Sequence, residues 1–575
     1  MNRQSTFACL LLATASYANA QDVEKEYLSL KDAWKSEPVK LSGTAGFSGT
    51  FYQGEGIAAR RDPLTSVFNA NLNITLLNKI NIPFSALLTT KEKIYSNGLE
   101  RYNHPFKQFG LSPSYKGLTV HAGHRSFQFS EYSLSGTLLL GGGIEFSPTK
   151  SLLSALFAYG RLAKATPAGS PGQATDVSHY ERRGGALKIR AGTARQHFEI
   201  IAMHISDLPY SLPADSRNRS APQENLVVSL ATLLSLAQLT CDLDLHLSYF
   251  SPNLFEPLSK NRQYSYRNQL FNDRPGTRSS RAFHAALQYK GKGWQSGINF
   301  KRVDPDYQSL GATYVCNDVE EHSVNAGCQL AGNKIQIQSA LGLQRNNLDE
   351  IQLSTKKRII TSVNLNFTLR PNWTLQGSYS TLNSKSLQVR DVYGDSLHFL
   401  QVSMNAGGTS SYGFGNKNYK AQFQLQTSLQ ESTNSLLLNK LMNHQSGLQC
   451  TFQKTALTFN FNALANSTRS QGNSAVDGFG GLAHFQKGFS KNKFTLSLST
   501  SYLKQSHSGR AISRTLLIGA AFYARLSKIL SFRLDYSLQE RKGLSQTVKN
   551  YQEHRLNFNC QITLNQKIRH AKTSK

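Results

Sequence analysis

Apolar and polar residues alternate along most of the chain, from about residue 41 to residue 564. In the stretch HRLNFNCQITL (residues 554–564), every second residue is apolar and the residues between them are polar. The stretches KFTLSLSTSY, ILSFRLDYSL, YKAQFQLQTS and RIITSVNLNFTLR have the same period of two. Successive side chains of a β-strand point to opposite faces, so this period predicts strands with one apolar and one polar face.

Strand length and connection length favour a membrane barrel over a soluble β-sandwich. Many predicted strands have about 10–14 residues, whereas strands of soluble folds usually have about 5–6. Short turns alternate with much longer polar segments such as residues 251–280, which is typical of transmembrane β-barrels. The short turns are expected at residues 78–79, 114–117, 148–150, 192–195, 235–238, 290–293, 331–334, 370–372, 415–418, 453–455, 490–493 and 526–528. They predict an antiparallel transmembrane β-barrel of about 26 strands (24–26), with short periplasmic turns and long extracellular loops.

The two ends of the chain differ from the alternating region. Residues 1–20 have a basic start, an apolar run and the sequence ANA, which is the layout of a cleavable secretory signal. The apolar run is too short to cross a bilayer as a helix, and we find no later transmembrane-helix candidate. We therefore expect export to the outer membrane of a Gram-negative cell, with a barrel over residues 41–564 and a basic periplasmic tail over residues 565–575.

Residues 21–40 have a helical period instead. Val23, Tyr27, Leu30 and Trp34 recur at the spacing of one face of an amphipathic helix. This leader is expected to lie in the periplasm or the lumen, where it would contact a partner or act as a short plug; the alternative is a frayed leader before the first strand. Nothing here is long enough for the plug domain of a TonB-dependent receptor.

The chain carries a formal net charge of +29. Such a balance often indicates nucleic acid as a partner, but the predicted export excludes it. A basic exported protein is expected to contact outer-membrane lipid and lipopolysaccharide, or anionic solutes. The alternative is that the lysines merely occupy turns.

Five cysteines follow residue 20, and an odd number argues against a complete disulfide framework. Four of them, Cys241, Cys328, Cys450 and Cys560, lie on apolar faces and are expected to be small lipid-facing residues. Cys316 is expected in a loop, and a Cys316–Cys328 bridge would require the strand geometry to change.

The stretch HAGHRSFQFS (residues 121–130) gathers two histidines, an arginine and two serines. In a strand, His121 and Arg125 share one face, while His124 and Ser126 share the other. His124 and Ser126 would be about 7 Å apart, which does not favour a direct hydrogen bond. The sequence has no G-x-S-x-G or H-E-x-x-H motif, so we expect no enzyme activity, no metal site and no cofactor.

The hairpin around this stretch is expected to be the least regular part of the wall. Three consecutive glycines in its second strand indicate a sharp bend or the close approach of another part of the chain. We predict that its loop folds inward and narrows the lumen. The residues of this possible constriction are His121, Arg125, Tyr132, Gly141, Gly142 and Gly143.

Residues 129–165 resemble a recurring segment of large porin-like outer-membrane β-barrel proteins of the Bacteroidetes type. The likeness lies in a tyrosine-x-leucine-x-glycine turn, the glycine-rich strand, a proline turn and the sequence YGRLAKA. The resemblance implies an outer-membrane location more than an activity. One departure is that the last predicted strand ends at Leu564 and is followed by a tail, whereas such barrels often end on an aromatic residue.

Basic residues outnumber acidic ones on the face opposite the apolar one. The expected pore-lining cations are Lys188, Arg190, Arg358, Arg370, Lys420, Arg533 and Arg555, against Asp242, Asp244 and Asp535. Such an excess would favour anions, as basic rings do in anion pores. The alternative is that these cations pair with inward carboxylates or reach lipid phosphates at the rims.

These patterns predict a porin-like channel or translocation pore with an anion bias. The alternative is a non-conducting barrel, plugged by its own loops and leader, that serves as a scaffold in an envelope assembly or secretion complex with other proteins. An outer-membrane enzyme is the third reading.

Overall fold

The computed structural model describes residues 39–89, 107–149, 151–167, 178–217, 220–258, 271–312, 314–352, 354–388, 399–416, 419–434, 437–470, 473–546 and 548–568. The strands of the first half are β1 (Val39–Glu55), β2 (Leu64–Leu76), β3 (Ile80–Thr89), β4 (Lys107–Leu111), β5 (Ser114–Tyr115), β6 (Leu118–Gln128), β7 (Ser135–Phe146), β8 (Leu153–Ala163), β9 (Arg182–Gly192), β10 (Gln196–Asp207), β11 (Glu224–Leu236), β12 (Leu239–Ser251), β13 (Arg278–Lys290) and β14 (Trp294–Val303). Those of the second half are β15 (Val319–Leu330), β16 (Ile335–Arg345), β17 (Ser354–Arg370), β18 (Trp373–Gln388), β19 (Phe399–Gly415), β20 (Tyr419–Asn434), β21 (Leu437–Phe452), β22 (Leu457–Ser470), β23 (Asn473–Phe489), β24 (Phe494–His507), β25 (Arg510–Arg525), β26 (Leu530–Gly543) and β27 (Tyr551–Ile568). A one-turn helix, α3 (Ala214–Arg217), lies between β10 and β11.

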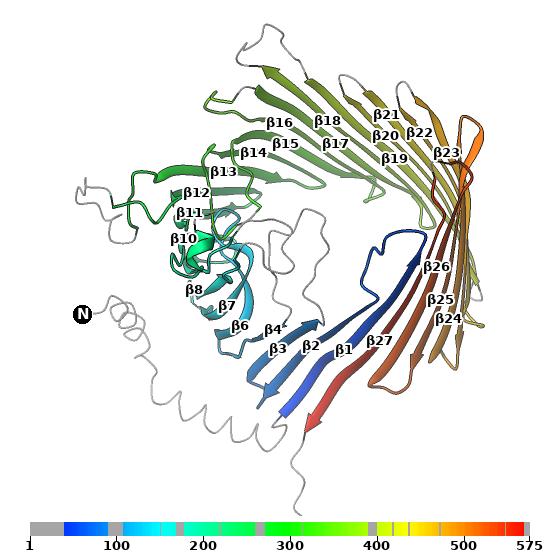
Figure 1. Ribbon diagram of the computed structural model, residues 1–575, viewed down its shortest axis with the longest axis horizontal. Coiled ribbons are helices and arrows are strands. Elements are labelled where there is room, and N and C mark those ends of the chain that lie inside the picture. Colours follow the sequence, from blue (N-terminus) through cyan, green and yellow to red (C-terminus); the bar gives the residue numbers. More distant parts are fainter. Residues whose placement is uncertain are drawn as a thin grey trace, which may run out of the picture.

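The strands form one closed antiparallel barrel (Figure 1). The first and last strands close it, with a continuous register from Val39 opposite Ile568 to Glu55 opposite Gln552. Strands β4 and β5 both pair with β3 and β6, so they are two pieces of one wall strand. Pro113 lies at the break, where its missing N–H interrupts the ladder. The 27 strand segments therefore make a 26-stranded wall, which confirms the fold class and the strand count predicted from the sequence.

All the predicted short turns join consecutive strands at one rim of the barrel. At the opposite rim, loop length changes along the chain. The connections are long in the first half, such as residues 252–277 between β12 and β13. Later on this rim, only two residues separate β20 from β21, β22 from β23 and β24 from β25. The long loops expected on this rim are therefore concentrated in the first half of the chain.

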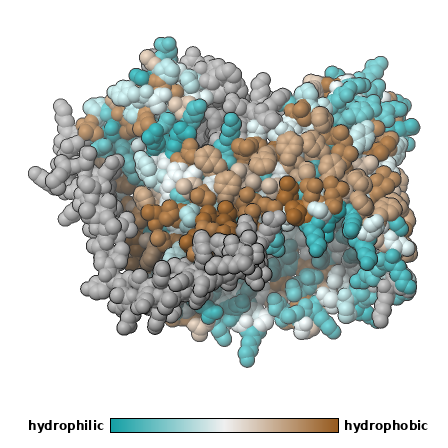
Figure 2. Space-filling view, turned by 90° about the horizontal axis from the view of Figure 1, so that it is seen from below, coloured by the Kyte–Doolittle hydropathy of each residue, from teal (hydrophilic) through white to brown (hydrophobic). Residues whose placement is uncertain are grey.

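Apolar side chains cover the outside of the barrel, where they form a band between two more polar rims (Figure 2). Ile200 is 46% exposed and Phe423 44% exposed, although both are apolar. An apolar band of this kind is typical of transmembrane barrels, where lipid covers it. No helix in the described part of the chain is long and apolar enough to cross a membrane.

Aromatic residues gather on the outside beside the short-turn rim. Neighbouring rings there include Tyr289 with Trp294 (4.9 Å between centroids) and Trp373 with Tyr412 (6.1 Å). The row continues with the pairs Tyr412–Phe414, Tyr419–Phe452, Phe452–Phe459 and Phe494–Phe522. Aromatic girdles mark the membrane interfaces of transmembrane barrels.

The five cysteines after residue 20 are all free. Cys241 and Cys450 are half-buried and share the outer faces of their strands with exposed leucines such as Leu243 and Leu448. Cys316 is exposed in the loop between β14 and β15, and the Cys316–Cys328 bridge is not formed.

Candidate functional site in the lumen

Two loops that are far apart in sequence meet inside the barrel. One joins β6 to β7 (residues 129–134), and the other joins β14 to β15 (residues 304–318). Ser309 Oγ donates to the backbone oxygen of Ser133 over 2.6 Å, and Thr137 Oγ1 donates to that of Gly311 over 2.7 Å. These contacts hold both loops against the inside of the wall.

The loops cover an apolar patch on the inner faces of β10 and β11. Ile201, Met203 and Ile205 alternate with the outward Ile200 and are fully buried. The same hydrophobic cluster contains Phe129 and Leu134 of the β6–β7 loop, together with Phe127 of β6 and Leu139 of β7. All but four of the buried apolar residues of the described chain lie between Phe127 and Val319. The core therefore fills one side of the barrel, here called the filled flank (the inner faces of β6–β14 with the two loops).

Asn225 joins the β14–β15 loop to the wall. Its amide is completely buried and donates to the backbone oxygen of Gln308 over 3.3 Å, while its oxygen accepts from the N–H of Leu310 over 3.1 Å. A buried amide with both its donor and acceptor groups bonded fixes the position of the loop.

Tyr132 is the centre of the contact between the two loops. Its ring lies 4.7 Å from that of His246 and 6.1 Å from that of Tyr307, and the ammonium group of Lys301 lies 5.3 Å from its centroid. The hydroxyl of Tyr307 donates to the backbone oxygen of Tyr132 over 2.7 Å. Burial raises the pKa of both tyrosine hydroxyls, so they stay neutral donors over the physiological range.

Other parts of the chain approach the glycine run of β7 closely. A Cβ at Gly143 would lie 2.9 Å from the ring of Phe127, which is folded over it, and a Cβ at Gly141 would meet the neighbouring strand β8. Gly142 faces outward and has ordinary space around it. The ring of Phe127 in β6 is therefore seated on Gly143, while the narrowing of the lumen by this hairpin stays a prediction.

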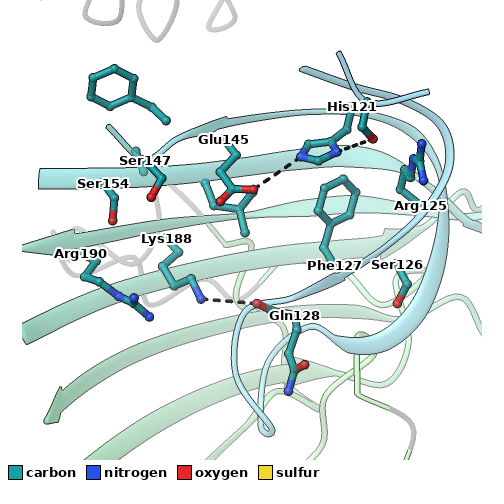
Figure 3. A pocket seen from close by; sticks show the side chains of 14 residues that line it. His121, Arg125, Ser126, Phe127, Gln128, Glu145, Ser147, Ser154, Lys188 and Arg190 are labelled. Atoms are coloured by element: carbon teal, nitrogen blue, oxygen red, sulfur yellow. Dashed lines mark hydrogen bonds and ion pairs between the residues drawn. The ribbon is translucent and has the colours of Figure 1, made fainter. Parts of the chain in front are cut away.

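A cavity of about 440 Å³ lies beside the loops on the inner face of β6–β9 (Figure 3). Its charged lining is His121, Arg125, Glu145, Lys188 and Arg190, joined by several serines. Lys188 donates to the backbone oxygens of Phe129 (3.3 Å) and Gln128 (3.4 Å). Arg190 is paired with the nearly buried carboxylate of Glu199.

Glu145 points toward His121 in this cavity (Figure 3), and Ser112 contacts the other ring nitrogen of His121. Ser112 Oγ is 2.9 Å from His121 Nδ1, and Glu145 Oε2 is 3.7 Å from His121 Nε2. The second distance is too long for the hydrogen bond that orients a catalytic imidazole. His124 lies on the outer face and accepts a hydrogen bond from the backbone N–H of Phe109. Within the described part of the chain, no hydrogen bond joins His124 to Ser126. The geometry gives neither histidine the contacts of a nucleophilic site.

Arg125 of the predicted constriction and the other predicted pore-lining cations lie at different heights along the wall. Arg125 donates to Ser85 Oγ and to the backbone oxygen of Pro83, and Arg358 donates to Gln344 Oε1. Arg533 pairs with Asp535 over 2.8 Å. Arg555 lies on the inner-facing side of β27, and its buried Nε has no hydrogen-bond partner among the described residues. Arg370 and Lys420 lie at the short-turn rim, beside the turns that follow β17 and β19.

Several predicted features fall outside the described residues. The signal segment 1–20 lies there, as do the leader residues Val23, Tyr27, Leu30 and Trp34 and most of the tail 565–575. Strand β1 begins at Val39 and β27 ends at Ile568, slightly beyond the expected bounds of 41–564. The resemblance of residues 129–165 to Bacteroidetes-type barrels stays a prediction.

The loop between β14 and β15 was not foreseen as part of the lumen. A signal for it was present, because β10 (EIIAMHIS) has apolar residues on both faces and the inner face of β11 (NLVVSLATLL) is apolar in part. A strand with lipid on one side needs a second apolar face only when something covers the inside.

No family model matches the chain, and no curated protein matches it either. The chain does match solved structures, at low sequence identity and low TM-score. OccAB2 of Acinetobacter baumannii is 10% identical, with 60% of this chain and 92% of that chain covered and a TM-score of 0.29. The P pilus usher (PapC) translocation pore is 10% identical, with coverages of 91% and 99% and a TM-score of 0.32. BauA, the ferric preacinetobactin receptor of Acinetobacter baumannii, is 9% identical, with coverages of 91% and 80% and a TM-score of 0.37.

Proposed function

We propose that this protein is a porin-like channel of the outer membrane. The observation that carries the proposal is the contrast between its two faces: an apolar, aromatic-edged outside and a polar inside on a closed 26-stranded wall. A barrel of this size encloses a wide lumen unless its interior is filled. Here the described loops fill one flank, and among the described residues the buried apolar core does not extend to the inner faces of β17–β27.

An anion bias follows from the partners of the lumen cations. Lys188, Arg125 and Arg358 donate to neutral oxygens of backbone, serine or glutamine. A cation whose partner is neutral keeps its charge available to solutes, whereas the ion pairs Arg190–Glu199 and Arg533–Asp535 cancel within the wall. The remaining positive field would favour anions, as basic linings do in other pores.

The test is single-channel recording of the purified protein in planar bilayers under a salt gradient. We expect stable openings and a reversal potential on the anion side. Stable openings with a cation-side reversal potential would overturn the bias alone. A barrel that inserts but carries no current would overturn the channel itself.

The filled flank also favours a second candidate, a barrel that acts as a scaffold in an envelope complex. Its supporting observation is the buried apolar core that the two loops form inside the wall. In that case, stoichiometric partner proteins would copurify with the barrel, and the purified barrel would be electrically silent.

A further inference from the structure

The inner faces of β18–β24 form a water-facing surface almost without charge. Strands β20, β21 and β22 have outward rows that include Phe423, Leu448 and Phe461, each exposed, so the alternate residues face inward. Among the inner-facing side chains of β18–β24 that the structure describes, the one lysine or arginine is Lys420 at the rim, and no aspartate or glutamate occurs there. We call this surface the amide wall (the inner faces of β18–β24).

Amide and hydroxyl groups dominate this wall. The prominent members are Gln422, Gln424, Gln426, Gln445, Gln449, Asn460, Asn462 and Asn466, with Ser411, Ser497 and Ser499 on the flanking strands. The strand register places them in rows across the sheet. One row runs from Gln422 through Gln449 and Asn460 to His484 and Ser499.

Glycines on the amide wall leave room for neighbouring amide side chains to lie flat against the sheet. The amide of Asn462 lies across Gly447, and that of Asn466 lies across Gly478, in the space that a Cβ would occupy. On the filled flank, the glycine of β7 accommodates an inward aromatic ring instead. Leu464 and Leu482 are apolar members of the amide wall, and neither belongs to a buried cluster.

The lack of charge is not imposed by burial. Gln422, Gln424 and Gln426 are exposed, so a lysine or glutamate at these positions would keep its hydration. The chain as a whole carries 64 lysines and arginines and 35 acidic residues. Seven neighbouring strands whose described inner-facing side chains carry no ionised group above the rim therefore form a distinct chemical surface of the lumen.

We propose that the amide wall is the path for uncharged, hydroxyl-rich solutes of the sugar class, an inference that rests on the proposed channel. A carboxamide offers two donors and an acceptor, and each sugar hydroxyl offers one donor and accepts in return. Because such bonds replace bonds to water at small net gain, a solute passes from amide to amide without being trapped. A charged wall would instead retain counter-ions and oppose solutes of its own sign.

The test compares sugar flux with ion current in the same protein. The variant Gln424→Leu/Gln426→Leu removes two neighbouring inward amides of β20, and Gln336→Leu/Gln338→Leu removes two inward amides of β16, outside the wall. Swelling of proteoliposomes in maltotriose reports sugar flux, and planar-bilayer conductance in potassium chloride reports an open, folded pore. We expect the sugar flux of the β20 variant to fall about two- to tenfold, which is the effect of one or two lost hydrogen bonds, while its conductance stays nearly unchanged. The β16 variant should keep the sugar flux and the conductance of the wild type.

A second pair of solutes tests the role of neutrality. Wild-type protein should admit glucose, and Gln424→Glu/Gln426→Glu should slow gluconate while leaving glucose unchanged. If the leucine and glutamate variants conduct ions and transport maltotriose, glucose and gluconate like the wild type, the amide wall is not the path. In that case the inference about sugars fails while the proposed channel stands. If the wild type neither conducts nor swells, the proposed channel itself fails.

Discussion

The two sides of this barrel share one wall design but use their inner faces differently. On the filled flank, the inner face of β10 carries Ile201, Met203 and Ile205, all fully buried under two loops. On the amide wall, the inner face of β20 carries Gln422, Gln424 and Gln426, all exposed. The two inward loops both come from the first half of the chain: a long one between β14 and β15 (residues 304–318) and a short one between β6 and β7 (residues 129–134). A closed barrel thus combines a stabilising core and a lumen by dividing its circumference between them.

The largest expected difference is in stability. Leu139→Ala would leave a cavity in the buried cluster of the filled flank and should lower the free energy of unfolding by about 2–5 kcal/mol. The matched change Leu464→Ala on the amide wall should cost less than about 1 kcal/mol, because no buried cluster surrounds Leu464. Urea titration of the folded barrel in lipid vesicles measures both. Equal losses would mean that the two flanks are not different in packing.

The glycines offer a second contrast. Gly143→Ala would place a methyl group 2.8 Å from the backbone oxygen of Phe157 and 2.9 Å from the ring of Phe127, so strand β8 or that ring must move, at a cost of about 1–3 kcal/mol. In Gly413→Ala the nearest atom would be 3.8 Å away, and the change should be tolerated. Single-channel records should show a noisier or larger conductance for Gly143→Ala only. The same conductance in both variants would contradict the close approach at Gly143.

Ion selectivity should depend on one flank more than on the turns. Lys188→Glu replaces a cation bonded to neutral carbonyls with an anion and should shift the reversal potential towards cations. Arg190→Glu should act in the same direction. Lys491→Glu, in the short turn between β23 and β24, should leave the reversal potential nearly unchanged. An equal shift of the reversal potential in Lys491→Glu would mean that the ion selectivity arises at the rim and not in the lumen.

The smallest expected effect is that of a single hydroxyl. Tyr307→Phe removes the hydrogen bond to the backbone oxygen of Tyr132 and should lower stability by about 0.5–1.5 kcal/mol. Tyr379→Phe, on the exposed outer face of β18, is the control and should have no measurable effect. Thermal unfolding in detergent compares the two variants with the wild type. Indistinguishable variants would remove this hydrogen bond from the contact between the loops.

The wall could be predicted from the sequence because its signals are local. The period of two in residues 554–564 and the turn residues at 78–79 act within one strand or one hairpin, and the structure has strands and turns at both places. The inward approach at the glycine run was also predictable, because Gly143 has no side chain to oppose Phe127.

The inside of the filled flank could not be predicted in the same way. Its contacts join residues far apart in sequence, such as Ser133 with Ser309 and Tyr132 with Tyr307. No local pattern encodes which loop reaches which strand, although the doubly apolar strand β10 and the partly apolar inner face of β11 indicate that some cover exists. The partners of individual cations, such as Glu199 for Arg190, depend on strand register and are equally non-local.

The most direct test of the divided lumen is the reach of a water-soluble thiol reagent in a cysteine-free background. Single cysteines would replace Gln424 on the amide wall and Ile201 under the loops, and a charged methanethiosulfonate would be added during single-channel recording. We predict a stepwise fall in current for Gln424→Cys and no change for Ile201→Cys, because Ile201 is fully buried. Block at Ile201→Cys with none at Gln424→Cys would contradict the division of the lumen into a filled and an open side.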